Sequence, residues 1–207
     1  SSTSTVNMHM QKLSAIMAYA VRESYRADNP AKQLGVADSI KSKHKRLPFD
    51  DGQLKAMFNA PLYTGCVDDQ RGYASPGDAT PRGARFWIPL ISLWTGMRLN
   101  EICQLLVSDI EIRDGVAIIL IQLEDTPEGA DDCEKRVKTE AGVRFVPVHP
   151  MLERIGFFDL VEAKAKAGDR RLFSELNLGA HGDYAHGMSQ WFSRFLISAG
   201  AKKPRTS

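Results

Sequence analysis

The chain has 207 residues, enough for one or two domains, and 43% of them are hydrophobic, which is ample for an ordinary core. No apolar run approaches the roughly 18 residues of a membrane span and no signal-peptide pattern opens the sequence, so an integral membrane protein is excluded and a cytoplasmic one is expected. The three scattered cysteines, Cys66, Cys103 and Cys133, predict free thiols rather than a disulfide framework.

The net charge of +2 is unevenly distributed. Residues 1–48 hold eight Lys and Arg against three Asp and Glu, a balance of +5, and the remainder has a balance of −3. Four of the basic residues gather in a short polar segment: Lys41, Lys43, Lys45 and Arg46. Because phosphate contacts dominate nucleic-acid affinity, this segment suits a polyanionic partner such as a nucleic acid. Charges that only keep the chain soluble are the alternative explanation.

The N-terminal region is predicted to be one helix followed by a linker. Apolar residues recur three and four positions apart over residues 7–27, which indicates an amphipathic helix, and Asn29-Pro30 is expected to end it. Residues 31–48 are polar and basic, as is typical of a connector between domains.

Two helices and a loop are predicted next. A helix should begin after Asp50, with Gln53 at the capping-box position. Residues 61–83 are rich in Gly and Pro and are predicted as loop. Residues 85–95 are apolar nearly all round, which indicates a buried helix that stops at Gly96.

The remaining chain predicts a small sheet between helices. A short helix is expected over 100–106, and the Asp114-Gly115 pair indicates a hairpin. The predicted strands are 110–112, 116–122 and 143–148, and the predicted later helices are 150–155, 158–167 and 185–199. The expected fold class is therefore α+β, mainly helical, with a three-stranded antiparallel sheet.

Arg98 and Glu101 are the first candidates for chemistry. An arginine within an apolar run is costly to bury unless an anion meets it. Glu101, three residues later, could be that anion, in a local ion pair worth only a few tenths of a kcal/mol. A ligand phosphate is the other possibility, because a planar guanidinium at the start of a helix can hold two phosphate oxygens. The pair alone does not decide between them.

The sequence TGMRLNEI over residues 95–102, followed by Leu105 and Asp109, resembles the first catalytic box of the tyrosine recombinases, or phage integrases. The resemblance implies that Arg98 grips the scissile DNA phosphate and that Glu101 supports it. It also implies a bacterial or phage-encoded protein that acts on double-stranded DNA.

The resemblance extends to the domain organisation. Residues 1–30 are similar to the end of a helical core-binding domain, 31–48 to its basic linker, and 49–207 to an incomplete catalytic domain of recombinase type. In this family the intact protein assembles into a tetramer on DNA. The reaction needs neither a metal nor a small-molecule cofactor, and the sequence holds no paired metal motif or phosphate-binding glycine loop.

Residues 138–148, KTEAGVRFVPV, are similar to the segment that carries the catalytic lysine of the family. The resemblance implies that Lys138 protonates the leaving 5′ oxygen. Lys135 and Arg136 are rivals if the register of the loop differs, and a solvated turn lysine is the structural alternative. Arg144 is expected to be a structural strand residue rather than a phosphate ligand.

The chain departs from the family pattern after the lysine segment. A second box, usually His-x-x-Arg, and a later tyrosine nucleophile are expected, but Tyr184 and Ser189 stand three residues after His181 and His186. We therefore expect a truncated catalytic domain.

The expected function is site-specific DNA recombination or integration in the intact protein, through a covalent tyrosine–DNA intermediate. The 207-residue chain is expected to bind DNA without cleaving it. One alternative is a non-catalytic DNA-binding or regulatory module on a degenerate recombinase scaffold. Another is a helical protein-interaction domain in which Arg98 is merely ion-paired.

Overall fold

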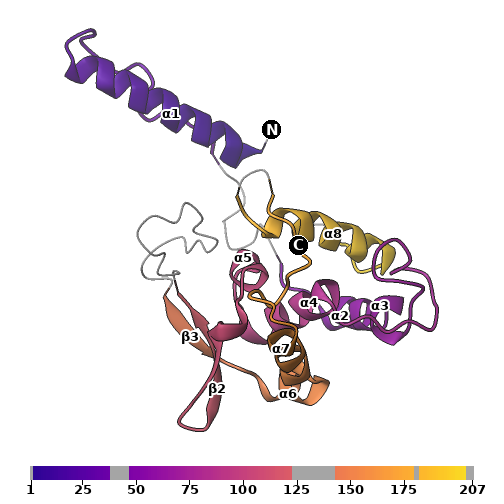
Figure 1. The fold of residues 1–207 in the computed structure, drawn as a ribbon. Helices are drawn as coiled ribbons and strands as arrows, with labels where there is room; N and C mark the ends of the chain where they lie inside the picture. Colours follow the sequence, from indigo (N-terminus) through magenta and orange to yellow (C-terminus); the bar gives the residue numbers. More distant parts are fainter. Residues whose placement is uncertain (1, 38–46, 123–142, 180–181, 204–207) are drawn as a thin grey trace. The chain divides into compact units, whose positions relative to one another are not determined.

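The computed structural model describes residues 2–37, 47–122, 143–179 and 182–203. The chain divides into two compact units, one that ends at Pro48 and one that spans Phe49–Lys203 (Figure 1). The second unit holds the three-stranded sheet and all but one of the described helices. The predicted class, α+β with a small antiparallel sheet, is confirmed.

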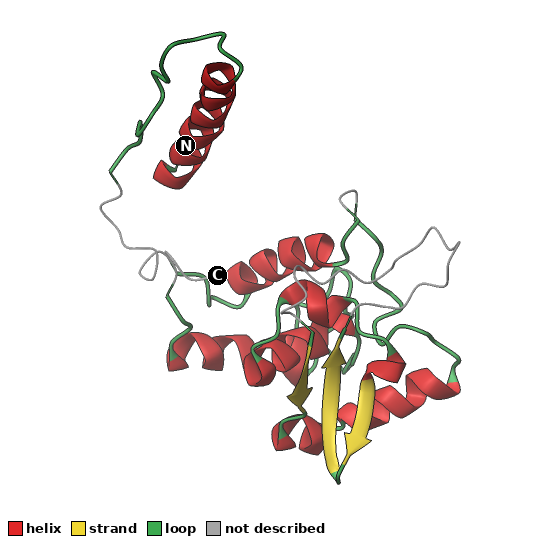
Figure 2. Cartoon of the chain, turned by 90° about the vertical axis from the view of Figure 1, so that its left-hand side faces the viewer, coloured by secondary structure: helices red, strands yellow, loops and turns green. Residues whose placement is uncertain are grey.

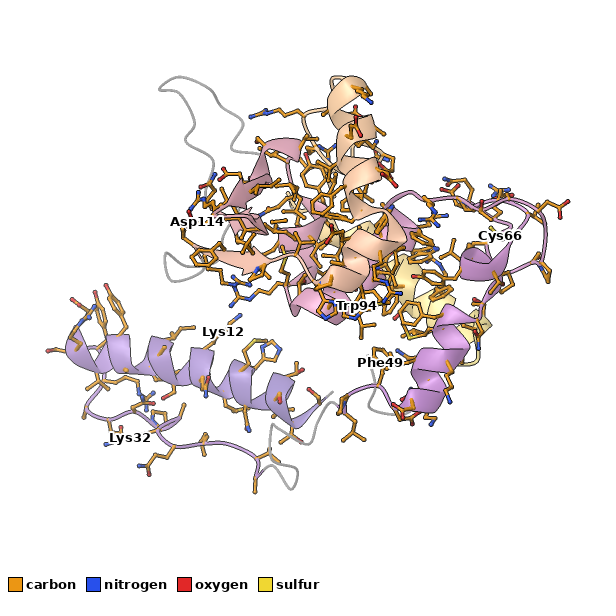
Figure 3. The ribbon with its side chains drawn as sticks, turned by 90° about the horizontal axis from the view of Figure 1, so that it is seen from below. Lys12, Lys32, Phe49, Cys66, Trp94 and Asp114 are labelled. Carbon is orange, nitrogen blue, oxygen red and sulfur yellow. The ribbon has the colours of Figure 1, made fainter. Side chains whose placement is uncertain are left out.

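The first unit contains one long helix, α1 (Thr3–Arg22), with Lys12 on the helix and Lys32 on the segment that follows it (Figure 3). The prediction of residues 7–27 was wrong at both ends. The helix ends early because Ser24 adopts a left-handed φ of 60° and the amides of Ser24 and Tyr25 bond to helix carbonyls, as in a Schellman motif.

Asn29 does not end α1, as the sequence had suggested, but ties the following segment to it. Its side-chain amide donates to the Ser14 carbonyl at 3.0 Å. Further along, Asn7 and Val36 exchange two hydrogen bonds of 2.9 and 2.7 Å. The segment after the helix therefore runs back alongside α1.

The second unit begins with helix α2 (Asp51–Phe58), whose predicted capping box is confirmed. The Asp50 carboxylate accepts from the Gln53 amide at 2.9 Å, and the Gln53 side chain accepts from the Asp50 amide at 3.1 Å. A short helix, α3 (Pro61–Thr64), lies inside the segment predicted as loop. Pro61 stands at its first turn, where a fixed φ and a missing N–H favour helix formation.

Helix α4 (Ala84–Thr95) is the buried helix that the sequence predicts. Trp87, Ile88 and Ile91 are each at most 1% exposed and lie in the core of the unit. Gly96 ends the helix with a left-handed φ of 64°, as expected for a glycine C-cap.

The sheet follows α5 (Leu99–Cys103) and the one-turn helix η2 (Val107–Asp109). Its strands are antiparallel in the order β1-β2-β3 (Figure 2): β1 (Ile110–Arg113), β2 (Val116–Ile121) and β3 (Arg144–Pro147). Asp114 and Gly115 both have positive φ, 50° and 77°, which is the geometry of the predicted two-residue hairpin turn. Ile119 on β2 lies opposite Ile110 and Val146, so the register carries one apolar face across all three strands.

The three later helices agree with the sequence prediction to within a residue or two: α6 (Pro150–Ile155), α7 (Phe157–Lys166) and α8 (Ala185–Ser198). Trp191, Phe195 and Leu196 form the buried face of α8, as the pattern indicates. None of the helices in the described part of the chain is long and apolar enough to cross a membrane.

Candidate functional site

Arg98 stands between the buried helix α4 and the short helix α5, at the point where the chain changes direction. Its backbone is extended, with φ −69° and ψ 145°. Extended backbone sends successive side chains to opposite sides. Met97 is accordingly buried, whereas the Arg98 side chain is 59% exposed. The local sequence thus anchors the segment through its apolar neighbours and leaves the arginine at the surface.

Glu101 is the buried partner of Arg98. Its side chain is only 4% exposed. The Arg98 backbone amide donates to Oε2 at 2.9 Å, and the Arg98 Nη1 donates to Oε1 at 3.1 Å. The local pairing that the sequence allowed is confirmed, and one carboxylate fixes both the backbone and the guanidinium of Arg98.

Arg144 is the second partner of Glu101, and the sequence did not reveal it. From strand β3, its Nη1 and Nη2 donate to Oε1 and Oε2 of Glu101 at 3.3 and 2.9 Å. Arg144 is therefore a strand residue, as predicted, but its guanidinium forms a two-pronged ion pair with a residue 43 positions earlier. The sequence did contain a signal. Arg144 lies two residues before Val146 and therefore on the same, apolar face of the strand, where a charge needs a partner.

The three side chains carry a net charge of +1, since two guanidinium groups share one carboxylate. Burial raises the pKa of Glu101, but the hydrogen bonds from Arg144 and the Arg98 amide, together with both positive charges, outweigh it and hold this pKa below its ordinary value. Glu101 is thus ionised at neutral pH. The gap that it lines between α5 and β2 has no room for a water molecule, so Glu101 supports its arginines rather than meeting a ligand.

The guanidinium N–H groups of Arg98 that Glu101 does not engage are the part of this cluster that can bind a ligand. Among the described residues, Glu101 is its guanidinium partner and engages only Nη1. The remaining N–H groups of Arg98 are those that a bidentate phosphate or carboxylate contact requires. An anion held here would meet a positive charge that is fixed in position beforehand.

The other polar residues of the TGMRLNEI segment and its continuation have structural roles. Asn100 accepts from the Tyr184 amide and donates to Gln104, both at 3.3 Å, and so joins α5 to the start of α8. Asp109, 1% exposed, accepts from the Leu106 amide at 2.7 Å. These contacts tie α5 to the start of α8 and cap the one-turn helix η2.

Two aromatic contacts lie near this region. Trp94, on the last turn of α4 (Figure 3), stacks on His149 with a ring separation of 5.9 Å. His149 caps α6, because its Nδ1 accepts from the Met151 amide at 3.1 Å. The expectation that His149 is a helix-entry residue rather than a catalyst agrees with this contact.

Tyr184 is buried under the Arg171 guanidinium, 4.1 Å from the ring centre.

Several predicted residues fall outside the described part of the chain. They are the lysine candidates Lys138, Lys135 and Arg136, and the connector residues Lys41, Lys43, Lys45 and Arg46. Cys66 and Cys103 are free, as expected, and both are buried; Cys133 also lies outside the described residues. Within the described ranges no cluster of His, Cys, Asp or Glu could hold a metal ion.

Comparison of the chain with models of known protein families, with characterised proteins and with solved structures found no match. The fold and the site by themselves define an α+β protein in which an exposed arginine, Arg98, pairs with a buried glutamate, Glu101, that a second arginine also contacts.

Proposed function

We propose that residues 49–203 belong to a catalytic domain of tyrosine-recombinase type and that Arg98 binds a phosphate of double-stranded DNA. The observation that carries this proposal is that the exposed Arg98 guanidinium is paired with the buried, ionised Glu101. A surface arginine loses side-chain entropy when it binds a phosphate, and a guanidinium that is already fixed loses less.

The chemistry of phosphoryl transfer explains why such an arginine is useful. Negative charge accumulates on the oxygens around the phosphorus in the transition state, and fixed cations stabilise it. Arg98 would supply one such cation, and Glu101 would keep it in place. Lys138, by resemblance to the family, would donate a proton to the leaving 5′ oxygen.

The 207-residue chain should bind DNA without cleaving it. Its five histidines include none in a His-x-x-Arg sequence, so the second cationic group of the family pattern is missing from these residues. In a protein that also carries that group and the tyrosine, we propose site-specific recombination by a tetramer on DNA. The basic segment Lys41, Lys43, Lys45 and Arg46 would add phosphate contacts.

A fluorescence titration of a labelled DNA duplex tests the role of Arg98. Arg98→Ala should weaken binding about tenfold, because one charge-assisted contact is lost. Arg113→Ala is the matched control, since Arg113 is 55% exposed and also pairs with a glutamate, Glu111 at 3.0 Å. Equal affinities for the Arg98→Ala and Arg113→Ala variants would contradict the proposal.

A suicide substrate that traps covalent protein–DNA complexes tests the second half of the proposal. The chain should yield no covalent product. A covalent product that disappears in the Arg98→Ala variant would show that the 207 residues already contain a complete active site.

A further inference from the structure

We propose that Arg144 is a positioning residue for Arg98: by occupying Glu101, it keeps the Arg98 guanidinium available to the DNA phosphate without touching that phosphate itself. The inference rests on the proposed function of Arg98. It assigns to the β3 strand a part in the site that lies beyond the first-box residues.

The sharing of Glu101 oxygens is the geometric basis. Oε1 accepts from Nη1 of both arginines, at 3.1 Å for Arg98 and 3.3 Å for Arg144. Oε2 accepts from the Arg98 backbone amide and from the Arg144 Nη2, each at 2.9 Å. The carboxylate offers about four acceptor positions, and these four donors fill them. Arg98 therefore holds Glu101 with a single side-chain nitrogen.

Removal of Arg144 would change this division. Glu101 would remain buried with two vacant acceptor positions, and among the described residues Arg98 is the other cation paired with it. Arginine and carboxylate favour a two-pronged arrangement, which would turn the Arg98 fork inward and away from a ligand. The cluster would also fall from a net charge of +1 to zero.

The orientation of Arg144 separates this role from direct phosphate binding. Both of its terminal nitrogens are directed to Glu101, and its side chain is 37% exposed against 59% for Arg98. A residue that acts through another residue gives a distinct signature in a double-mutant cycle, because its effect vanishes when the second residue is removed.

The test is a double-mutant cycle on duplex binding, with Arg98→Ala, Arg144→Gln and the two combined in the full chain. Arg144→Gln should weaken binding by about the same factor as Arg98→Ala, roughly tenfold, and the double variant should be no weaker than either. Losses that multiply in the double variant would show that Arg144 contacts the phosphate itself. An Arg144→Gln variant that binds as tightly as the unmodified chain would also overturn the inference.

A rescue variant adds a readout that a merely structural role of Arg144 would not produce. Adding Glu101→Gln to Arg144→Gln removes the charge that would capture Arg98, so affinity should recover several-fold over Arg144→Gln alone. It should stay below that of the unmodified chain, because the charge of Glu101 no longer holds Arg98 in place. If the inference is wrong, the second substitution gives no recovery. Should Arg144→Gln fail to fold, Arg144→Lys takes its place in the cycle: lysine keeps the positive charge but loses the two-pronged contact, so it should weaken binding less than Arg98→Ala and have no effect in the Arg98→Ala background. A further loss in that background would overturn the inference.

The single variant separates the two proposals. If Arg98→Ala alone leaves duplex affinity unchanged, the proposed function of Arg98 fails. If Arg98→Ala weakens binding and Arg144→Gln does not, only the positioning role of Arg144 fails.

Discussion

Glu101 accepts four hydrogen bonds, two on each oxygen, as only an ionised carboxylate can, and its burial makes that charge costly unless both arginines are in place. The exposed arginine, in contrast, needs no local partner to be stable in water. Glu101 pairs with both arginines, and the proposed roles differ: Arg98 would face the ligand and Arg144 would support Arg98 through Glu101.

The lowered pKa of Glu101 predicts a contribution to stability that depends on pH. Because its folded-state pKa lies below the unfolded value of about 4.3, the contribution is complete above that value and is lost as the pH falls through the folded pKa. Thermal unfolding followed between neutral pH and about pH 3 should therefore show a shallower loss of stability for Glu101→Gln than for the unmodified chain.

Glu162→Gln is the control for this pH experiment. The ion pair of Glu162 with Lys166 is exposed on α7, and removing such a pair changes stability by only a few tenths of a kcal/mol. A Glu101→Gln profile as steep as that of Glu162→Gln below about pH 4.5 would contradict the role given to Glu101.

At the scale of single residues, the local contact was one of two alternatives left open by the sequence, and the distant contact was missed. Arg98 and Glu101 are three residues apart, so any helix start between them brings them together. The contact of Arg144 with Glu101 exists only because the sheet forms and its register turns Arg144 toward α5. No local pattern encodes that register, since β2 and β3 are joined by a long segment rather than by a tight turn.

Turns and caps determine where the elements of the second unit begin and end. The Asp50 capping box, the glycine that ends α4 and the Asp114-Gly115 turn were all predicted, because each depends on a residue type with a specific backbone preference. The end of α1 was not, because Ser24 occupies a left-handed position usually filled by glycine. The short helix α3 was missed because it lies in a segment rich in Gly and Pro, residues that are typical of loops.

The hairpin gives a clean test of these backbone preferences. A Cβ at Gly115 would meet no atom within 4 Å, so Gly115→Ala adds only the strain of a positive φ and should lower the free energy of unfolding by about 1 kcal/mol. Chemical denaturation measures the difference.

Gly187→Ala is the matched substitution in helix α8. A Cβ there would also meet nothing within 4 Å, and the residue lies in a helix, so alanine should raise the free energy of unfolding by up to about 1 kcal/mol. Shifts of the same sign for both variants would contradict the assignment of Gly115 to a left-handed turn.

The whole molecule consists of two units, and the cluster around Glu101 belongs to the second. Charge is distributed differently: residues 1–48 carry the excess of basic side chains, and residues 49–207 carry a slight acidic excess. In the proposed function, the basic segment contributes general electrostatic attraction to DNA and Arg98 contributes one particular phosphate contact. The two contributions to affinity are therefore separable by mutation.

Neutralising the basic segment should weaken DNA binding and reduce its salt dependence. Each phosphate contact contributes about 0.9 to the slope of log K against log salt concentration, so replacing all four residues with glutamine should lower that slope by up to about 3.6. The substituted residues are Lys41, Lys43, Lys45 and Arg46. Binding isotherms at a series of salt concentrations give the slope.

A charge-matched variant controls for the loss of overall positive charge. This variant replaces four exposed lysines elsewhere in the chain with glutamine, as in the first variant: Lys12, Lys32, Lys55 and Lys166. A slope that falls as much in this variant as in the first would show that bulk charge, and not the basic segment, controls binding.

NMR of arginine side chains measures whether a DNA phosphate occupies Arg98. In the full chain labelled with ¹⁵N-arginine, Arg98→Lys identifies the Arg98 Nε–H signal and Arg113→Lys identifies the reference signal. On addition of a DNA duplex the Arg98 signal should shift and saturate, while that of Arg113 should stay in place. A duplex that binds the chain and leaves the Arg98 signal unmoved would show that Arg98 does not hold a DNA phosphate.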